Sequence, residues 1–452
     1  MIYTARYVLP ITSSYIEDGA IVIEGDTIID VGPLADILAK HPDHEVTDLG
    51  LSAILPGFVD CHTHLDYSVM RGLVEDSAYA KWKYHLMLAE EHLSREDWNV
   101  SAKLGALEAV TAGITTIADI THNKGTLEAV CQVGLRAIIY HEVETMDKNA
   151  IAEAMDAVTA EIAAWRELAC ERVEIGIAPH SVYSCHPELF KQVSAYAQDG
   201  TPVAIHLAGS SEEYEFVKYG SSRLATEVRD QYNAKAPFWL PTGVSPVRYV
   251  LQWDVLDAPN VLAVHCTQVD DNDIEILTRK DVAIAYCPRF NAKLGMGIAP
   301  LRKFLDAGLR VGIGTDSPAA ANGMDMFEEL RTDLYLQRAA FGKKSFFTAV
   351  EALRMATLGG AEALRLDDTV GSLEAGKQAD IIAVDLSHSA QVPTHEPESV
   401  IVHSSHPSEV TMTMVAGEVI YEEGKVVRGD GDRTKAAAEK IRLKLRDREI
   451  KH

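Results

Sequence analysis

The sequence predicts an α/β protein whose main part is a (β/α)8 TIM barrel, with a small β-sandwich domain built from both ends of the chain. From His62 to about Leu364, short apolar runs alternate with longer stretches in which apolar residues recur at helical spacing. This alternation is typical of βα units around a parallel sheet, and about eight runs over roughly 300 residues suit a closed barrel. A doubly wound sheet would place a glycine-rich phosphate-binding turn after an early strand, and the sequence contains none.

Eight apolar runs are expected to form the barrel strands in chain order. They are GFVDCHTH, GITTIADI, LRAIIYHEV, VEIGIAPHS, PVAIHLAG, VLAVHCT, VAIAYCP and LRVGIGTDS. Stretches between them, such as AIAEAMDAVTAEIAAWRELA, carry apolar residues at the spacing of an amphipathic helix.

Both ends of the chain have the residue pattern of short strands. IYTARYVLP and GAIVIEGDTIIDVG, separated by Gly, Asp and Pro turns, make the first 56 residues look all-β, and GSLEAGKQADIIAVD and MTMVAGEVIYEEGKVV repeat the pattern near the C-terminus. We therefore expect residues 1–56 plus 366–430 to build one small β domain and residues 57–365 to form the barrel. Residues 431–452 read as a charged amphipathic helix.

The composition excludes several classes of partner. The chain has 42 Lys+Arg against 67 Asp+Glu and a formal net charge of -25, and such a surface repels nucleic acids and anionic membranes. No stretch of 18 or so apolar residues suggests a membrane span, and the start of the chain lacks the features of a signal peptide. The scattered cysteines indicate reduced core thiols in a cytoplasmic protein; they are Cys61, Cys131, Cys170, Cys185, Cys266 and Cys287.

A set of polar residues follows the predicted strands. His62 and His64 end the first strand, and because residues two apart in an extended chain point the same way, both can face one metal ion. A single HxH pair is weak evidence, but His206 and His265 end further runs and Asp316 follows the last one. Strand ends converge at the mouth of a barrel, so three imidazoles and a carboxylate could hold zinc or iron there.

Each of these residues also has a purely structural interpretation. A polar residue at a strand end can simply be hydrogen-bonded within the fold, as His141 and His180 equally could be. For one histidine the two interpretations are evenly matched, whereas the whole set in chain order on a barrel favours a metal site.

These motifs resemble the amidohydrolase superfamily, in particular its branch of cytosine, S-adenosylhomocysteine and aminodeoxyfutalosine deaminases together with triazine hydrolases. The resemblance covers nearly the whole chain, through PGFVDCHTHLD, TAGITTIAD, PHSVYS, GIGTDSPA and the closing ATLGGAEALRL and GSLEAGKQADIIAVD. It implies that one divalent metal, zinc or else iron, binds to His62, His64, His206 and Asp316. It also implies that His265 lies beside the metal-bound water and the substrate, with Asp316 and His265 as the catalytic residues, and that the chain forms a homo-oligomer.

The number of metals can be judged from the fourth predicted strand. Relatives with two metals bridge them with a carboxylated lysine on this strand, and VEIGIAPHS contains no lysine. We therefore expect one metal, which lowers the pKa of a bound water so that hydroxide can attack an electron-poor heteroaromatic carbon.

One position departs from the resembled pattern. Ring deaminases of this branch carry a glutamate three residues after the histidine of the fifth strand, and here that place is Gly209. Glu213 lies nearby, but Ser210 to Glu213 fits a capping box that starts the next helix, and this interpretation is the stronger one. The resemblance implies hydrolytic deamination of an aminated heteroaromatic or adenine-nucleoside-like substrate such as aminodeoxyfutalosine. Gly209 leaves two alternatives: hydrolysis of another leaving group (chloride, an amine or a cyclic amide), or a weakly catalytic ligand-binding homologue.

Candidate residues for a small heterocyclic substrate come from further segments. HLDYSVMRGLVEDSAYAKW, WLPTGVSPVRYV and CPRFNAKLGMGIAPL resemble parts of aminodeoxyfutalosine deaminases. An arginine there could hold a carboxylate or stack on a ring, and Tyr79, Phe238 and Trp239 could add aromatic walls. Packing under long loops is an alternative role for the tryptophans. The pocket candidates are Arg71, Trp82, His180, Arg289 and Asn291.

Overall fold

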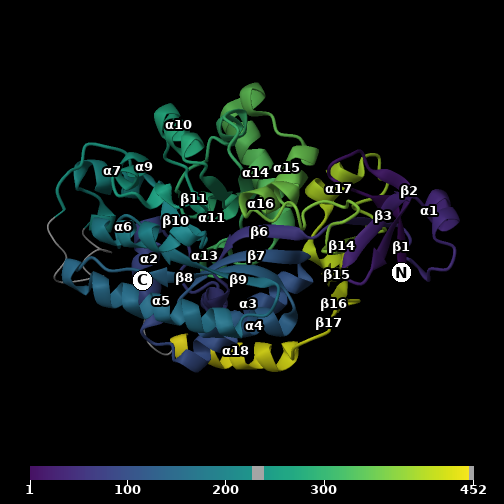
Figure 1. Ribbon diagram of the computed structural model, residues 1–452, viewed down its shortest axis with the longest axis horizontal. Helices are drawn as coiled ribbons and strands as arrows, with labels where there is room; N and C mark the ends of the chain where they lie inside the picture. Colours follow the sequence, from purple (N-terminus) through teal and green to yellow (C-terminus); the bar gives the residue numbers. More distant parts are fainter. Residues whose placement is uncertain (226–238, 447–452) are drawn as a thin grey trace.

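The computed structural model describes residues 1–225 and 239–446, and it contains the predicted barrel (Figure 1). Its eight parallel strands pair in chain order. They are β6 (Phe58–Thr63), β7 (Ile114–Thr121), β8 (Arg136–Val143), β9 (Val173–Pro179), β10 (Val203–Leu207), β11 (Val261–His265), β12 (Ala283–Tyr286) and β13 (Val311–Ile313). Seven of the eight predicted runs contain one of these strands, and β7 extends one residue beyond its run, to Thr121.

The sheet closes on itself between its first and last strands. Thr63, at the end of β6, forms a parallel bridge with Asp316, just beyond β13. This closure brings the end of the first strand beside the end of the eighth, although the two are separated by about 250 residues.

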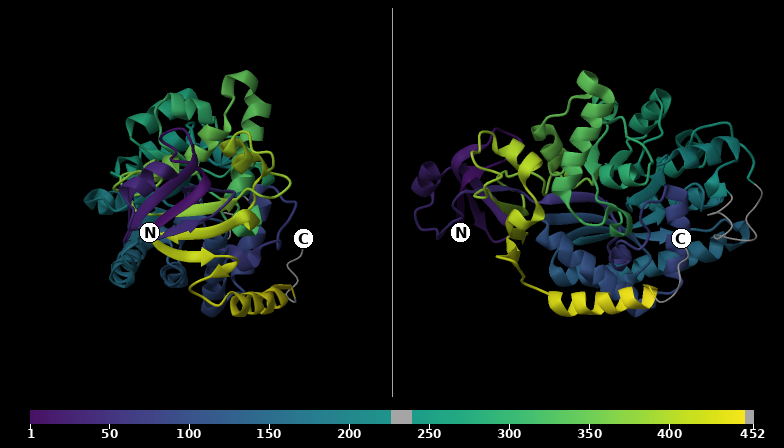
Figure 2. Two further views of the ribbon diagram at one scale, coloured as in Figure 1. Left: turned by 90° about the vertical axis from the view of Figure 1, so that its right-hand side faces the viewer. Right: turned by 180° about the vertical axis from the view of Figure 1, so that it is seen from behind.

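Helices and short helical turns surround the barrel (Figure 2). The longer ones are α2 (Tyr79–Glu90), α3 (Arg95–Thr111), α4 (Lys124–Val133), α5 (Ile151–Leu168), α6 (Pro187–Tyr196), α7 (Ser211–Tyr219), α10 (Asp271–Arg279) and α14 (Met326–Phe341). The shorter ones are η1 (Leu65–Met70), α9 (Pro246–Leu251), α11 (Pro288–Lys293), α12 (Leu301–Asp306), α13 (Pro318–Ala321), α15 (Ala349–Met355) and α16 (Leu358–Ala363).

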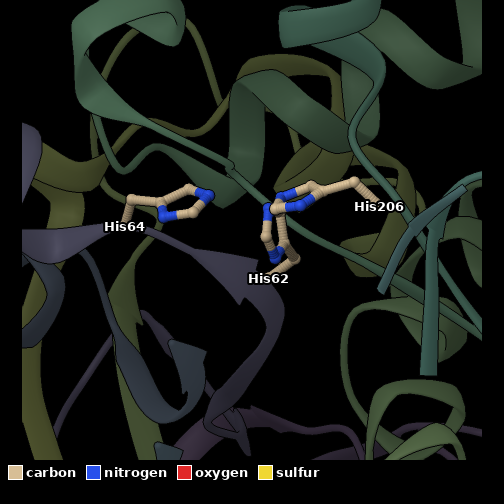
Figure 3. A group of neighbouring side chains, drawn as sticks. All are labelled: His62, His64 and His206. Carbon is tan, nitrogen blue, oxygen red and sulfur yellow. The ribbon is translucent and has the colours of Figure 1, made fainter. Parts of the chain in front are cut away.

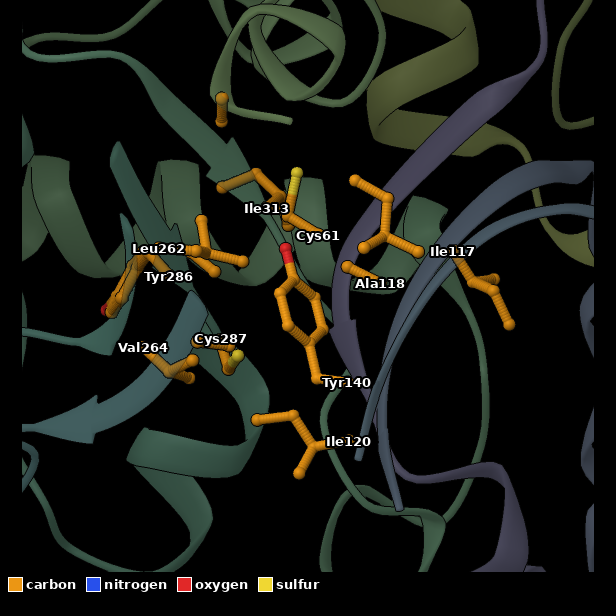
Figure 4. Close-up of a cluster of buried hydrophobic side chains, with 14 of the residues drawn as sticks. Cys61, Ile117, Ala118, Ile120, Tyr140, Leu262, Val264, Tyr286, Cys287 and Ile313 are labelled. Carbon is orange, nitrogen blue, oxygen red and sulfur yellow. The ribbon is translucent and has the colours of Figure 1, made fainter. Parts of the chain in front are cut away.

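The barrel interior is filled by side chains that need room from the neighbouring strands. Figure 4 shows buried residues of β6, β7, β8, β11, β12 and β13 meeting around Tyr140. A Cβ atom on Gly176 would lie 2.7 Å from the Tyr140 ring, and one on Gly312 would collide with the Cys61 sulfur. Glycine at these two strand positions therefore allows the interior to pack.

The two chain ends build one mixed sheet beside the barrel, where the purple and yellow segments of Figure 1 meet. Its strand order is β17-β16-β15-β14-β5-β1-β2-β3, with β4 paired to β1. The strands are β1 (Ile2–Val8), β2 (Ile16–Glu24), β3 (Thr27–Pro33), β4 (Val46–Asp48), β5 (Ser52–Pro56), β14 (Ile381–Asp385), β15 (Val410–Val415), β16 (Glu418–Glu422) and β17 (Lys425–Val426). The division of the chain at residues 56, 365 and 430 stays a prediction.

A buried ion pair joins this sheet to the barrel. Arg136, which begins β8, donates to Asp380 at 2.9 and 3.0 Å, and Asp380 directly precedes β14. Because Arg136 starts its strand, the small sheet lies at the opposite end of the barrel from the strand ends that carry the candidate metal ligands.

Three further helices complete the described chain. The amphipathic C-terminal segment forms α18 (Gly431–Arg446), which packs on α3 beneath the barrel in Figure 1. The other two are α1 (Leu34–Lys40) and α17 (Pro397–Ser404). The expectation that the first 56 residues are all-β is wrong at α1, where Ile37 anchors a short helix against the β2–β3 hairpin.

The prediction of six reduced thiols is wrong for one pair. Cys131 of α4 and Cys170, just after α5, form a disulfide with Cα atoms 5.8 Å apart. A separation of 39 residues hid the pairing, because only the packing of neighbouring barrel helices brings these cysteines together. Cys61, Cys185, Cys266 and Cys287 are free and buried, as expected.

No helix within residues 1–225 and 239–446 is long and apolar enough to cross a membrane.

Candidate metal centre and substrate cavity

The predicted metal ligands meet at the strand ends. His62, His64 and His206 point their rings toward one another (Figure 3), and one nitrogen from each lies within 4.8 Å of the others. Asp316 adjoins this group, because its Oδ2 lies 3.5 Å from Nε2 of His62. The same oxygen lies 3.8 Å from Nε2 of His265. The structure thus brings together all five residues predicted to form the metal centre and its catalytic pair.

The backbone orients two of the imidazoles. Nδ1 of His64 donates to the carbonyl of Ile120 at 2.8 Å, and Nδ1 of His206 donates to the carbonyl of His180 at 2.9 Å. A ring nitrogen that faces a carbonyl must carry the proton, so the other nitrogen, Nε2, is bare in a neutral ring. This is the arrangement in which histidine binds a metal.

Two buried atoms at the centre have no hydrogen-bond partner among the described residues. They are Nε2 of His62 and Oδ2 of Asp316. Buried polar atoms are normally satisfied, and a nitrogen lone pair facing a carboxylate oxygen cannot satisfy it without a cation or a proton between them. A divalent metal fits this donor set.

Burial sets the charge state of the site. It lowers the pKa of His62, His64 and His265 well below the usual value, and that of His206 to about 4, so that the rings are neutral near pH 7. Burial also raises the pKa of Asp316 to about 7, against the opposing effect of the Ser317 N–H group. Neutral imidazoles and one carboxylate are the ligands that zinc and iron accept.

A second carboxylate supports the centre from behind. Asp60 is fully buried and accepts hydrogen bonds from the backbone and hydroxyl of Thr315 at 2.9 and 2.6 Å and from the backbone of His62 at 3.3 Å. It therefore ties the first strand to the eighth directly behind two candidate ligands. Burial raises its pKa to about 7, and the bonds from Thr315 oppose this shift.

Two site residues adopt backbone conformations that non-glycine residues rarely take. His265 has φ 77° and Asp316 has φ 60°. Such conformations persist only where the surroundings enforce them, and they are common where a side chain must point in one direction.

The groups of possible ligand atoms among the described residues share members, which favours a single metal, and one of them, His265, Cys287 and Asp316, shares Asp316 with the centre. Glu142, His180 and His206 form a second group of possible ligand atoms within 4.8 Å. His206 belongs to both groups but has only one bare nitrogen, since its Nδ1 donates to a carbonyl. In addition, β9 contains no lysine that could bridge two ions.

A cavity lies over the metal centre, between the strand ends and α2. Tyr79, Trp82, Lys83 and Leu86 line it from one face of α2, at positions i, i+3, i+4 and i+7. The remaining lining residues are His64, Tyr67, Glu142, His180, His206, His265, Phe290, Asp316 and Ser317.

Lys83, Glu142 and Phe290 line this cavity but were not predicted from the sequence. Two signals could have identified Lys83 and Glu142. The spacing along KWKYHLML marks a single helix face, and Glu142 lies two residues beyond Tyr140, which points into the barrel. By the alternation of a strand, Glu142 therefore falls on the inner side.

The predicted pocket residues lie in different places. Trp82 and His180 line the cavity, and so does Tyr79. Asn291 is fully buried and opposes the lowering of the His265 pKa, but neither its polar side-chain atoms nor Nδ1 of His265 forms a hydrogen bond among the described residues. Trp239 packs on Phe216 and Tyr249 instead of lining the cavity, and Phe238 lies outside the described residues.

The two arginines do not line the cavity. Arg71 pairs with Glu108 on the outside of the barrel. Arg289 is buried and pairs with Glu328 and Glu329 of α14 at 2.8 and 3.1 Å. Both guanidinium groups therefore serve ion pairs within the fold.

Gly209 lies in a packed position that leaves little room for a side chain. A Cβ atom there would lie 2.9 Å from the His265 ring and 3.0 Å from the end of Met296. Ser210 caps α7 by accepting from the Glu213 backbone at 3.1 Å, so the capping interpretation is confirmed for this serine. The Glu213 carboxylate accepts from the backbones of Ala208 and Gly209 at 2.9 and 2.8 Å, so both of its oxygens are engaged in bonds to the backbone.

Comparison with known proteins agrees with this site. The Amidohydrolase family model matches residues 53–420. A 5-methylthioadenosine/S-adenosylhomocysteine deaminase of Pelotomaculum thermopropionicum is 35% identical over 96% of this chain and 95% of its own length.

Two solved structures share the fold. An adenosine deaminase of Xanthomonas campestris with bound zinc superposes with a TM-score of 0.85 and 26% identity, covering 99% of this chain and 98% of its own. The aminofutalosine deaminase of Helicobacter pylori, in complex with methylthio-coformycin, has a TM-score of 0.75 and 19% identity over 93% of this chain and 99% of its own, and it shows the fold alone.

Proposed function

The chain belongs to the amidohydrolase family, and on that premise we propose that it is a metal-dependent deaminase of an adenine-nucleoside-like substrate. The observation that carries this proposal is the convergence of three neutral imidazoles with Asp316 on one buried point, where Nε2 of His62 and Oδ2 of Asp316 have no other described partner. The enzyme would hydrolyse a carbon–nitrogen bond that is not a peptide bond.

The metal ligands in this proposal are His62, His64, His206 and Asp316. Zinc is the first choice, because a relative with the same fold binds it, and iron is the alternative. When bound, the metal lowers the pKa of a water so that a nucleophile is available near neutral pH.

The protein residues then control the protons and the orientation. Asp316 takes the proton of the attacking water. Because its Oδ2 lies close to His265, the imidazole can orient the oxygen of the same water. Phe290 stacks on the His265 ring at 5.5 Å and fixes its plane.

The cavity walls support a flat aromatic substrate. Trp82 and Phe290 meet edge to face at 5.4 Å and form an apolar wall, and Lys83, Glu142 and His180 line the same cavity with polar side chains. The name of the relative makes 5-methylthioadenosine and S-adenosylhomocysteine, together with aminodeoxyfutalosine, the first substrates to examine. Asn291 is proposed to hold His265, while homo-oligomeric assembly and a cytoplasmic location stay predictions.

Gly209 supports a second candidate function. With no side chain there to carry a proton, the site could instead hydrolyse a leaving group such as chloride or an alkylamine on a heterocycle.

Metal analysis combined with substrate screening tests both candidates. We expect one zinc or iron per chain and ammonia release from adenine nucleosides. Chloride or alkylamine release from triazines or pyrimidines, without ammonia release from any nucleoside, would favour the second candidate. Bound metal without turnover of any substrate would contradict both and favour a ligand-binding role.

A further inference from the structure

Deamination requires a proton source at the heterocycle, besides the residue that accepts the proton of water. Ring nitrogens must gain a proton as the oxygen adds to the neighbouring carbon, or negative charge accumulates on the ring. The source must lie in the cavity, have a dissociable proton and have an atom that is not already committed to the fold.

Most polar residues that line the cavity are committed. The Tyr67 hydroxyl donates to Glu90 at 3.0 Å, and the Tyr79 hydroxyl bonds that of Tyr183 at 2.5 Å. Nδ1 of His180 faces the Ser184 hydroxyl at 2.6 Å, and burial lowers the pKa of this histidine well below the usual value. None of these groups is suited to deliver a proton to a ring nitrogen.

Glu142 meets all three conditions. Its Oε1 is buried and has no hydrogen-bond partner within the described chain, and it lies 3.9 Å from Nε2 of His180. Its carboxylate lies within 4.8 Å of ligand nitrogens of both His180 and His206, which puts it close to the reacting atoms.

We propose that Glu142 is the catalytic acid of this enzyme, which delivers a proton to a ring nitrogen of the substrate. This inference rests on the deamination proposed above. Burial raises the pKa of Glu142, as do Glu90 and Asp66, while Lys83 and His122 oppose the shift, so that the carboxyl can hold a proton closer to neutral pH than an exposed glutamate.

The protons balance over one turnover. Asp316 takes one proton from water, and the Glu142 carboxyl gives its own to the ring nitrogen as the water oxygen bonds to the adjacent carbon. The amine then leaves with the electron pair of the broken C–N bond and the proton held on Asp316. The Glu142 carboxylate recovers a proton from the new hydroxyl group, which leaves a ring ketone, ammonia and both carboxyl groups in their starting states.

Lys83 is the rival donor in the cavity. Carboxyl groups exchange protons with ring nitrogens near neutral pH more readily than ammonium groups do, which favours Glu142. The lysine is assigned to the opposite role, a fixed positive charge that limits how far the pKa of Glu142 rises.

The test compares four variants of the metal-loaded protein with 5-methylthioadenosine as substrate. Glu142→Gln keeps the shape but carries no acidic proton, Glu142→Ala opens space, Lys83→Met removes the rival, and Glu144→Gln is the matched control two residues away. We expect Glu142→Gln to lower kcat about 100-fold or more with KM changed less than about threefold, as loss of a general acid does. Metal content should stay at one ion per chain, and Glu144→Gln should keep kcat within about threefold.

Rescue by a small acid separates a catalytic role from a structural one. Formate can enter the space left by Glu142→Ala, and we expect it to restore kcat at least about tenfold there but not in Glu142→Gln. Full kcat in Glu142→Gln, loss of kcat only in Lys83→Met, or loss without rescue by formate would each overturn the assignment. Absence of ammonia release from the unaltered protein would instead contradict the proposed function itself.

Discussion

The metal side and the substrate side of the site are built in different ways. On the metal side, backbone carbonyls orient His64 and His206, and Asp60 ties together the strands that carry His62 and Asp316. On the substrate side, α2 presents side chains that pack on aromatic rings, and atoms such as Nε1 of Trp82 and Oε1 of Glu142 have no described partner. The first side is prearranged by hydrogen bonds to the backbone, whereas the second is shaped by the packing of aromatic rings, so the chemistry and the specificity of the enzyme are set by different kinds of contact.

Removing a ligand from the prearranged side should have the largest effect. His206→Ala should abolish metal binding and lower kcat/KM by about 10³-fold or more, because the metal supplies several kcal/mol of transition-state stabilisation. His141→Ala is the matched control, since His141 also lies near a strand end but bonds Glu161 at 2.8 Å outside the centre. Metal analysis and ammonia assays measure both variants, and equal losses would break the comparison.

A weaker effect is expected from the support behind the ligands. Asp60→Asn keeps its size but weakens the bonds to Thr315 and His62, and it should lower metal affinity about 10–100-fold. Competition with a chelator measures this affinity. An unchanged value would mean that the strands hold the ligands without Asp60.

Stability should depend on pH through Glu213. Burial raises the pKa of this carboxyl from 4.5 to about 7, so the folded chain holds the proton more tightly than the unfolded chain between these values. Its contribution is therefore complete below pH 4.5 and is lost as the pH rises through 7.

Glu213→Gln removes this titration. Between pH 5 and pH 8 the free energy of unfolding should fall by about 2 kcal/mol less in the variant than in the unaltered protein. Urea titrations at the two pH values measure the difference. The same slope in both proteins would show that Glu213 is ionised throughout.

The smallest effect is expected where the two sides of the site touch. In Gly209→Ala the new methyl group would press on the His265 ring and on Met296, so kcat should fall about tenfold with metal content unchanged. In Gly209→Glu we expect kcat to fall further, because the larger side chain has even less room. A gain in ammonia release by the glutamate variant would indicate that Gly209 replaced a catalytic acid and that Glu142 does not act as one.

The metal side could be predicted from sequence because strand ends converge in any closed barrel. Once eight apolar runs were identified, the positions of His62, His206 and Asp316 followed from the fold. The order of the strands and the alternation of side chains along each strand decide which residues meet, and both can be read from the sequence.

The substrate side could not be predicted in the same way. The spacing along α2 marks one helix face, but the sequence does not show that this face covers the metal centre, or that Arg71 and Arg289 find carboxylate partners elsewhere. The disulfide between Cys131 and Cys170 escaped prediction for the same reason, since it depends on how two helices pack. Side-chain pairing between separate elements is decided by tertiary packing, and composition and periodicity do not record it.

The small sheet imposes an order of events on a newly made chain. Strand β5 pairs with β14 from Ser52↔Asp385 to Pro56↔Ile381, so its partner is synthesised more than three hundred residues later. At translation rates of about 5–20 residues per second, β5 waits on the order of half a minute with one edge unpaired. An open strand edge invites pairing with other chains. The barrel can close before this sheet does, and the N-terminal strands are therefore the segment most exposed to misassembly during synthesis.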